Sequence, residues 1–171
     1  MARLFVSFVH EDEKVASAVQ GLLQTELDLR EEVFLSSDKS QIYAGDLWLE
    51  KIKEALLAAE IVILMLSRRS VARPWVNFEA GAAWLADKKV IPVCYGNLSK
   101  DALPHPYSAI QALNLQSEAY YLVKSVNHQL NLDAPMSPSA VYKGSLAERG
   151  QAIKDGEYER LANALAEFKD D

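Results

Sequence analysis

Short apolar runs, each the length of one β-strand, alternate along this chain with segments whose apolar residues recur at a helical period. Strands that alternate with helices are joined by right-handed crossovers, so the strands are parallel and helices cover both faces of one sheet. The alternation therefore predicts an α/β fold, and the run EIVILMLS, apolar on both sides, is expected to be its central strand. The strand candidates are RLFVSFV (3–9), EEVFLS (31–36), EIVILMLS (60–67), KKVIPVCY (88–95) and ALNLQ (112–116).

Helices are expected between these runs. Asp12 is a plausible N-cap for a helix that ends near Leu27, and Asp46 is one for a helix over 44–59. Pro74 suits the first turn of a helix that continues to Ala86, because proline lacks only an N–H that would be unpaired there. Residues 117–130 form the next helical segment, while 95–109 is mostly loop.

The pattern breaks near Leu132, where LDAPMSPSAVYKGS is typical of a linker. We therefore divide the chain into a domain over 1–131 and a linker with a C-terminal helix over 132–171. In that helix, Tyr158, Leu161, Leu165 and Phe168 share a face, so it either docks back on the domain or belongs to a longer protein. The fold is expected to survive removal of 145–171.

Composition excludes several classes of function. The formal charge of −6 and the pI near 5.1 argue against nucleic-acid binding, which depends on clustered Lys and Arg. No segment approaches the roughly 18 to 20 apolar residues of a membrane helix, and the start MARLFVSFVHEDE turns acidic too early for a signal peptide. We expect a cytoplasmic protein with no membrane partner. Cys94 has no metal-ligand spacing around it and is expected to be a small buried hydrophobe.

In a sheet of this kind, ligands bind outside the carboxyl ends of the strands, where the winding reverses. That crevice is predicted to be lined by residues that follow the first three strands. They are Phe8, Val9 and His10, then Ser37 and Asp38, and then the 67–79 segment.

Glu79 is the unusual residue of that last segment. On a helical wheel that starts at Pro74, Glu79 falls inside the apolar sector with Trp75 and Phe78. A carboxylate that faces a core is costly to ionise. Either it is paired, for example with backbone or with Arg68, Arg69 or Arg73, or it borders a cavity where its chemistry is used.

Three motifs in register carry a resemblance. They are F-x-S in the first strand followed by an acidic helix start, G-x-x-W before I-x-x-A-L (45–56), and the W-x-x-x-E formed by Trp75 and Glu79. Over roughly 3–131 the chain resembles a bacterial Toll/interleukin receptor (TIR) domain of the NAD-consuming type. The resemblance implies a flavodoxin-like, five-stranded parallel sheet of order 2-1-3-4-5 with helices on both faces, here followed by a C-terminal helix.

In enzymatic members of that family, the glutamate of W-x-x-x-E is the catalytic residue that cleaves NAD⁺ between ribose and nicotinamide, and Glu79 matches it. One carboxylate suffices, because nicotinamide in NAD⁺ is a cationic leaving group that departs neutral and needs no general acid. The resemblance thus implies NAD⁺ as substrate, with no cofactor and no metal. It also implies a role in antiphage defence or signalling, and products that are nicotinamide with ADP-ribose or a cyclic isomer.

The resemblance suggests further substrate-binding residues, each with a plainer alternative. Family members line the nucleotide cleft at the end of the first strand, yet a histidine there also caps helices or faces solvent. The loop over 38–45 matches one that gates the cleft or contacts a neighbouring protomer, which implies self-association, but it is equally a surface loop. The tryptophans could line the site or fill the core. The candidates are Phe8, Val9, His10, Asp38, Trp48 and Trp75.

Three other functions compete with this one. A non-enzymatic TIR scaffold would recruit other TIR domains, although scaffolds of the family often lack the glutamate. A response-regulator receiver needs an aspartate at the end of the third strand, where this chain has Ser67 and Arg68, so that hypothesis fails. A nucleoside deoxyribosyltransferase-like enzyme would also use a carboxylate, and free bases offered as acceptors would distinguish it.

Overall fold

A computed structural model describes residues 3–29, 32–38, 48–134 and 156–170 of the 171. Its five-stranded sheet has the order β2-β1-β3-β4-β5, and every pair is parallel. This confirms the flavodoxin-like α/β fold, with β3 in the centre and buried along its whole length. The strands are β1 (Leu4–Val9), β2 (Val33–Asp38), β3 (Ile61–Leu66), β4 (Lys89–Cys94) and β5 (Leu113–Asn114).

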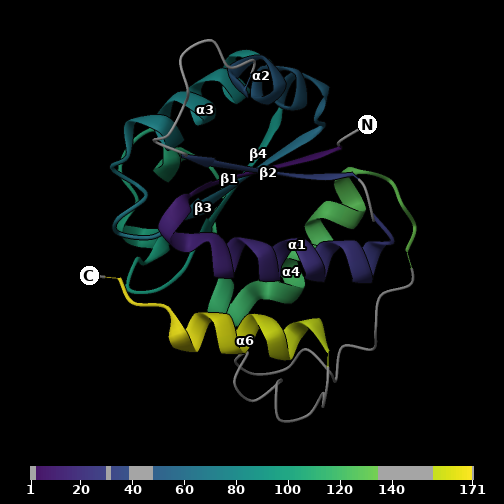
Figure 1. The fold of residues 1–171 in the computed structure, drawn as a ribbon, viewed down its shortest axis with the longest axis vertical. Helices are drawn as coiled ribbons and strands as arrows, with labels where there is room; N and C mark the ends of the chain where they lie inside the picture. Colours follow the sequence, from purple (N-terminus) through teal and green to yellow (C-terminus); the bar gives the residue numbers. More distant parts are fainter. Residues whose placement is uncertain (1–2, 30–31, 39–47, 135–155, 171) are drawn as a thin grey trace.

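Helices cover both faces of the sheet. In Figure 1, α2 and α3 lie on one face, α1 and α4 lie on the other, and α6 runs along the outside of the second layer. Each face has its own apolar core. The helices are α1 (Glu13–Leu27), α2 (Trp48–Ala58), α3 (Pro74–Leu85), α4 (Leu115–Gln129) and α6 (Glu157–Glu167), and 3-10 turns occupy His10–Asp12, Lys100–Ala102 and Tyr107–Ala109.

Helix α3 begins at Pro74, as the sequence predicts, but its buried face is narrower than the helical wheel suggests. Val76, Glu79, Ala80 and Ala83 are buried, whereas Phe78 is 60% exposed. The helix is apolar nearly all round, so periodicity alone does not decide which side faces the sheet. The small side chains decide it, because they let the helix approach the strands closely.

Helix α6 packs back onto the domain, which is the first of the two alternatives drawn from the sequence. Tyr158 and Leu161 are buried in the same core as α1 and α4. The contact with α1 is close at Gly21, where a Cβ would lie 2.5 Å from a carboxylate oxygen of Glu157. The expectation that the fold survives without 145–171 stays a prediction, and this burial is a physical reason against it.

Asp12 lies at the N-cap position of α1, but its side chain makes no capping hydrogen bond. It turns inward to the carboxyl ends of β3 and β4 instead. Cys94, at the end of β4, is fully buried as expected, and burial raises the pKa of its thiol to about 11. Within the described ranges, no helix has both the length and the apolar character needed to cross a membrane.

Candidate functional site

Glu79 is 0% exposed and its carboxylate meets the sheet. The Ser7 hydroxyl donates a hydrogen bond to Oε2 at 2.5 Å, and the Ser36 hydroxyl donates one to Oε1. Hydrogen bonds from hydroxyls to an ionised group are strong, so the two donors offset part of the cost of holding the charge away from water. Each oxygen retains acceptor capacity for a further donor.

The strand register explains why these two serines meet one carboxylate. Ser7 of β1 pairs directly with Ser36 of β2, and paired residues of neighbouring strands point to the same face. Along β1, Val6 and Phe8 lie in the core under α1, so Ser7 between them faces α3. Two adjacent strands thus present two hydroxyls to one turn of α3.

A cavity of about 370 Å³ lies between α2 and α3, and Glu79 is part of its wall. This volume lies within the roughly 300–1,000 Å³ range of small-molecule sites. Among the described residues that line it, Glu50 and Lys53 of α2 are charged besides Glu79, and the others are apolar. A buried carboxylate therefore borders a space that can hold a small polar group against an apolar wall.

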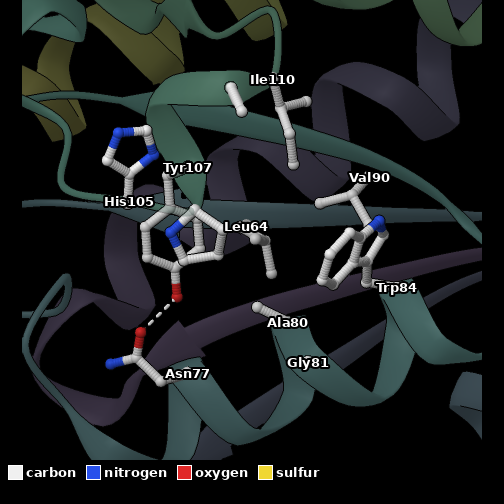
Figure 2. A pocket seen from close by; sticks show the side chains of 11 residues that line it. Leu64, Asn77, Ala80, Gly81, Trp84, Val90, His105, Tyr107 and Ile110 are labelled. Atoms are coloured by element: carbon white, nitrogen blue, oxygen red, sulfur yellow. Dashed lines mark hydrogen bonds between the residues drawn. The ribbon is translucent and has the colours of Figure 1, made fainter.

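Another cavity, of about 470 Å³, lies on the other side of α3 (Figure 2). Trp84, Val90 and Ile110 surround it, and the Tyr107 hydroxyl donates a hydrogen bond to Asn77 Oδ1 at 2.6 Å at its edge. The described residues that line it include no carboxylate. The cavity beside Glu79 is therefore the better candidate for chemistry that develops positive charge.

The arginines that were considered as partners of Glu79 have other contacts. Arg69 pairs with Asp12 at 3.2 Å, Arg73 pairs with Glu11 at 2.8 Å, and Arg68 donates to the carbonyl of Asn97. The partners of Glu79 include Ser7 and Ser36, which sequence reasoning missed as site residues. The F-x-S motif contains Ser7, and strand alternation places it on the same face as Val9, so this signal was available.

The other candidate residues are dispersed. Phe8 is buried in the core under α1, on the opposite face from Glu79, whereas Val9 is buried on the α3 face. His10 is exposed and lies 3.6 Å from Glu13. Trp75 is half-buried and stacks near Phe78, with ring centroids 5.5 Å apart.

For two candidate residues, Asp38 and Trp48, the structure describes the backbone alone. The backbone of Asp38 ends β2 and that of Trp48 begins α2, but their side chains are outside the described part of the structure. Residues 39–45 of the proposed gating loop also lie outside the described residues. Roles in substrate binding for all these residues stay predictions.

A second polar cluster lies at the carboxyl ends of β3 and β4. Tyr95 donates to Asp12 Oδ2 at 2.5 Å, Ser67 donates to the same oxygen at 3.1 Å, and Arg69 lies beside Oδ1. Burial raises the pKa of Asp12, although the hydrogen bond from Tyr95 and the charge of Arg69 oppose the rise. Burial also raises the pKa of Tyr95 well above its usual value, so Tyr95 remains a neutral donor.

The model of the TIR domain family matches residues 4–127, which is most of the sheet and its helices. The chain belongs to the TIR domain family. Among solved structures, this TIR domain is similar to the TIR domains of the activated Roq1 resistosome that directly recognises the pathogen effector XopQ. The identity is 11%, the TM-score is 0.40, and the match covers 98% of this chain and 86% of that one. No curated protein matches the chain.

Proposed function

We propose that this TIR domain cleaves NAD⁺ at the bond between nicotinamide and ribose, with Glu79 as the catalytic residue. The observation that carries the proposal is a buried carboxylate, held by Ser7 and Ser36, in the wall of a cavity. It is the glutamate of the W-x-x-x-E motif in a chain that belongs to the family.

The chemistry needs little beyond this carboxylate. The glycosidic electron pair leaves with nicotinamide, which becomes neutral, and positive charge moves onto the ribose carbon and its ring oxygen. A fixed anion beside the ribose stabilises that charge, and it does so most strongly where water is scarce. Attack by water then gives ADP-ribose and a proton, whereas attack by a ring nitrogen of the adenine gives a cyclic isomer.

The serines would fix the direction of the carboxylate in this reaction. Because Ser7 and Ser36 each donate to one oxygen, the carboxylate of Glu79 is held in a fixed orientation beside the cavity that it lines. Preorganised acceptors need no rearrangement as charge develops, which is the source of their catalytic effect. A ribose hydroxyl that donates to Glu79 would place the reacting carbon beside the charge.

Substitution of Glu79 by Gln tests the proposal, because it removes the charge and keeps the shape. We expect NAD⁺ cleavage to fall at least ~100-fold, the scale of losing one electrostatic stabiliser. The melting temperature should change little, because the serine hydroxyls rotate and can accept from the new amide. Glu54→Gln, on the exposed side of α2, is the matched control and should retain the parent rate.

The measurements are initial rates with product identification by mass spectrometry, together with thermal melts of the same preparations. A Glu79→Gln protein that is folded and still cleaves NAD⁺ at the parent rate would show that Glu79 is architectural. Free bases added as acceptors distinguish hydrolysis from base exchange, which is the reaction expected of a deoxyribosyltransferase-like enzyme.

Association with other TIR domains is the second candidate function, and one observation favours it. Helix α3 exposes Phe78, Trp84 and Leu85 to solvent by 60%, 67% and 85%. Phe78 and Leu85 are seven residues apart and share one side of the helix, whereas Trp84 lies on the other side. Exposed apolar side chains that share a face indicate a protein interface more often than scattered ones do. Such association is compatible with catalysis, and a role in defence or signalling would use either activity.

A further inference from the structure

The chain's own C-terminal segment, Phe168 to Asp170, covers the carboxyl ends of β3 and β4. This is the edge of a doubly wound sheet where ligands bind, close to the point between β1 and β3 where the winding reverses. The segment follows α6 and lies apart from the Glu79 cavity, whose lining comes from α2 and α3. Its contacts are specific, and they resemble those that a ligand would make.

The carboxylate of Asp170 is surrounded by backbone donors from two loops. Arg68 N–H donates to Oδ2 at 3.2 Å, Asn97 N–H donates to the same oxygen at 3.3 Å, and Arg69 N–H donates to Oδ1 at 3.4 Å. Successive backbone N–H groups that converge in this way form a concave anion-binding site, suited to carboxylate or phosphate. The donors belong to the β3–α3 and post-β4 loops, which also hold each other through Arg68 and the Asn97 carbonyl.

The Phe168 ring fills an aromatic slot beside these donors. It packs edge-on against Tyr95 with centroids 5.0 Å apart, and the Arg69 guanidinium lies 5.3 Å from its centroid. Gly96, at φ +63°, makes room, because a Cβ there would lie 2.6 Å from the Phe168 ring. Phe168 also lines a cavity of about 270 Å³, so the space would grow if the ring left.

The acidic residues around this cavity are each paired with a base. Arg69 faces Asp12, Arg73 faces Glu11 at 2.8 Å, and Lys14 faces Glu167 at 3.0 Å. The carboxylates that line this cavity are therefore each balanced by a basic side chain, whereas the carboxylate of Asp170 is held by three backbone N–H groups. An incoming anion that replaces Asp170 would meet these dipoles and the Arg69 side chain.

We propose that the loops after β3 and β4 form a binding site for a nucleoside phosphate, and that Phe168 and Asp170 occupy it as an internal pseudo-ligand. Phe168 stands where a planar base would stack beside Tyr95 and Arg69, and Asp170 stands where a phosphate would accept from Arg68, Arg69 and Asn97. Aromatic and guanidinium groups stack on any base, so the base identity is open. The site is independent of NAD⁺ cleavage.

The test compares the full chain with a Phe168→Ala, Asp170→Asn double variant, using calorimetry and amide NMR with AMP, inorganic phosphate and adenosine as probes. In the parent protein, the segment Phe168 to Asp170 competes with AMP for the site. The apparent dissociation constant for AMP is therefore higher than that of the open site, because only a small fraction of molecules has the site open. We expect AMP to bind the double variant at least ~10-fold more tightly than the parent. The amides of Arg68, Arg69 and Asn97 should shift, and phosphate or adenosine alone should bind more weakly than AMP.

Asn163→Ala is the control, because it alters an exposed side chain of α6 and leaves Phe168, Asp170 and the lining of the cavity unchanged. It should bind AMP as the parent does. If the double variant does not unfold cooperatively, Asp170→Asn alone is used and should show a smaller gain in AMP binding.

Three results would overturn the proposal. The first is that the double variant does not bind AMP, even though faster amide exchange at Arg68 and Asn97 shows that the segment Phe168 to Asp170 has left the site. Another is equal binding of phosphate and AMP, which would reduce the site to a simple anion site. The third is AMP binding whose amide shifts lie elsewhere.

Discussion

Glu79 keeps its position through two hydroxyl groups that come from neighbouring strands, so its orientation depends on the register of the sheet. A slip of one residue in β1 or β2 would turn one serine to the opposite face. The carboxylate is therefore coupled to the most regular part of the fold, while the cavity beside it is formed by helices. Catalytic groups need neighbours that fix their orientation, and for Glu79 strands β1 and β2 supply them.

Ser36→Ala tests that support. Removing one donor leaves a buried carboxylate oxygen without its hydroxyl partner, which should lower the free energy of unfolding by about 1–3 kcal/mol. NAD⁺ cleavage should fall more than stability alone explains, because the carboxylate loses its set direction. Ser17→Ala on α1 is the control, since that half-exposed serine is far from the site in the fold. Urea titrations and initial rates that do not distinguish the two variants would contradict the role of Ser36.

The raised pKa of Asp12 leads us to expect a specific pH dependence of the free energy of unfolding. Its pKa is raised by burial, so between the ordinary aspartate pKa of 3.8 and the higher pKa of the folded state, the folded protein binds more protons than the unfolded chain. In that window, the contribution of Asp12 to stability falls as pH rises, and the penalty is complete above the native pKa. Asp12→Asn removes this slope while keeping an oxygen that can accept from Tyr95.

Melts of the parent and Asp12→Asn proteins from pH 3 to pH 7 provide the measurement. The stability of the parent relative to the variant should decrease as pH rises above the ordinary carboxyl range. A difference that stays constant would mean that the hydrogen bond from Tyr95 and the charge of Arg69 cancel the effect of burial, and a difference that increases with pH would mean that they outweigh it.

At the residue scale, the sequence predicted that Glu79 is buried but not what it contacts. The apolar sector around position 79 indicated burial, and the W-x-x-x-E motif indicated a role. The partners could not be read from α3 itself, because Ser7 and Ser36 lie 72 and 43 residues away along the chain. Asp12 shows the opposite error: its position before α1 indicated a cap, but tertiary partners at β3 and β4 hold its carboxylate instead.

At the scale of elements, strand and helix periods identified every strand and the order of the helices, because β3 and its neighbours have runs too apolar for a surface. The fifth strand was expected over five residues but pairs over only Leu113 and Asn114. Asn114 ends it early, since its side chain accepts from the N–H groups of Gln116 and Ser117 and begins α4 there. The docking of α6 was left open because its partners in α1 lie more than a hundred residues earlier.

Leu161→Ala tests whether α6 is part of the cooperative unit. Leu161 is 0% exposed in the core shared with α1 and α4, so truncation should lower the free energy of unfolding by ~2–5 kcal/mol. Asn163→Ala, on the exposed side of the same helix, should change it by less than ~0.5 kcal/mol. Equal urea midpoints for the two variants would show that α6 is peripheral and that the domain boundary near 131 is correct.

At the scale of the whole molecule, the large apolar side chains that the described residues expose are unevenly distributed. Leu49 and Leu57 of α2, and Phe78, Trp84 and Leu85 of α3, are exposed on the layer that contains the candidate site, whereas Tyr121 is exposed on α4 of the opposite layer. Association through the first layer would place a second copy next to the Glu79 cavity. Catalysis and self-association would then share one face.

Trp84→Glu should weaken self-association through this layer, because it replaces an exposed aromatic side chain of α3 by a charge without disturbing the core. Tyr121→Glu is the matched control, an exposed aromatic on the other layer. Sedimentation velocity over a concentration series should show a monomer for Trp84→Glu at concentrations where the parent and Tyr121→Glu associate. If NAD⁺ cleavage depends on association, specific activity should rise with concentration only in the latter two.

The position of α6 over α1 has a consequence for synthesis on the ribosome. Helix α1 is made early, but the residues Tyr158 and Leu161 that complete its core follow about 130 residues later, which at roughly 5–20 residues per second is a delay of ~7–26 seconds. For most of that interval the apolar face of α1 lacks both α4 and α6. Once α4 ends at Gln129, the apolar groove along α1 and α4 stays open for about 30 further residues, or ~1.5–6 seconds. We therefore expect the emerging polypeptide to bind chaperones of the holdase type until α6 is released from the exit tunnel.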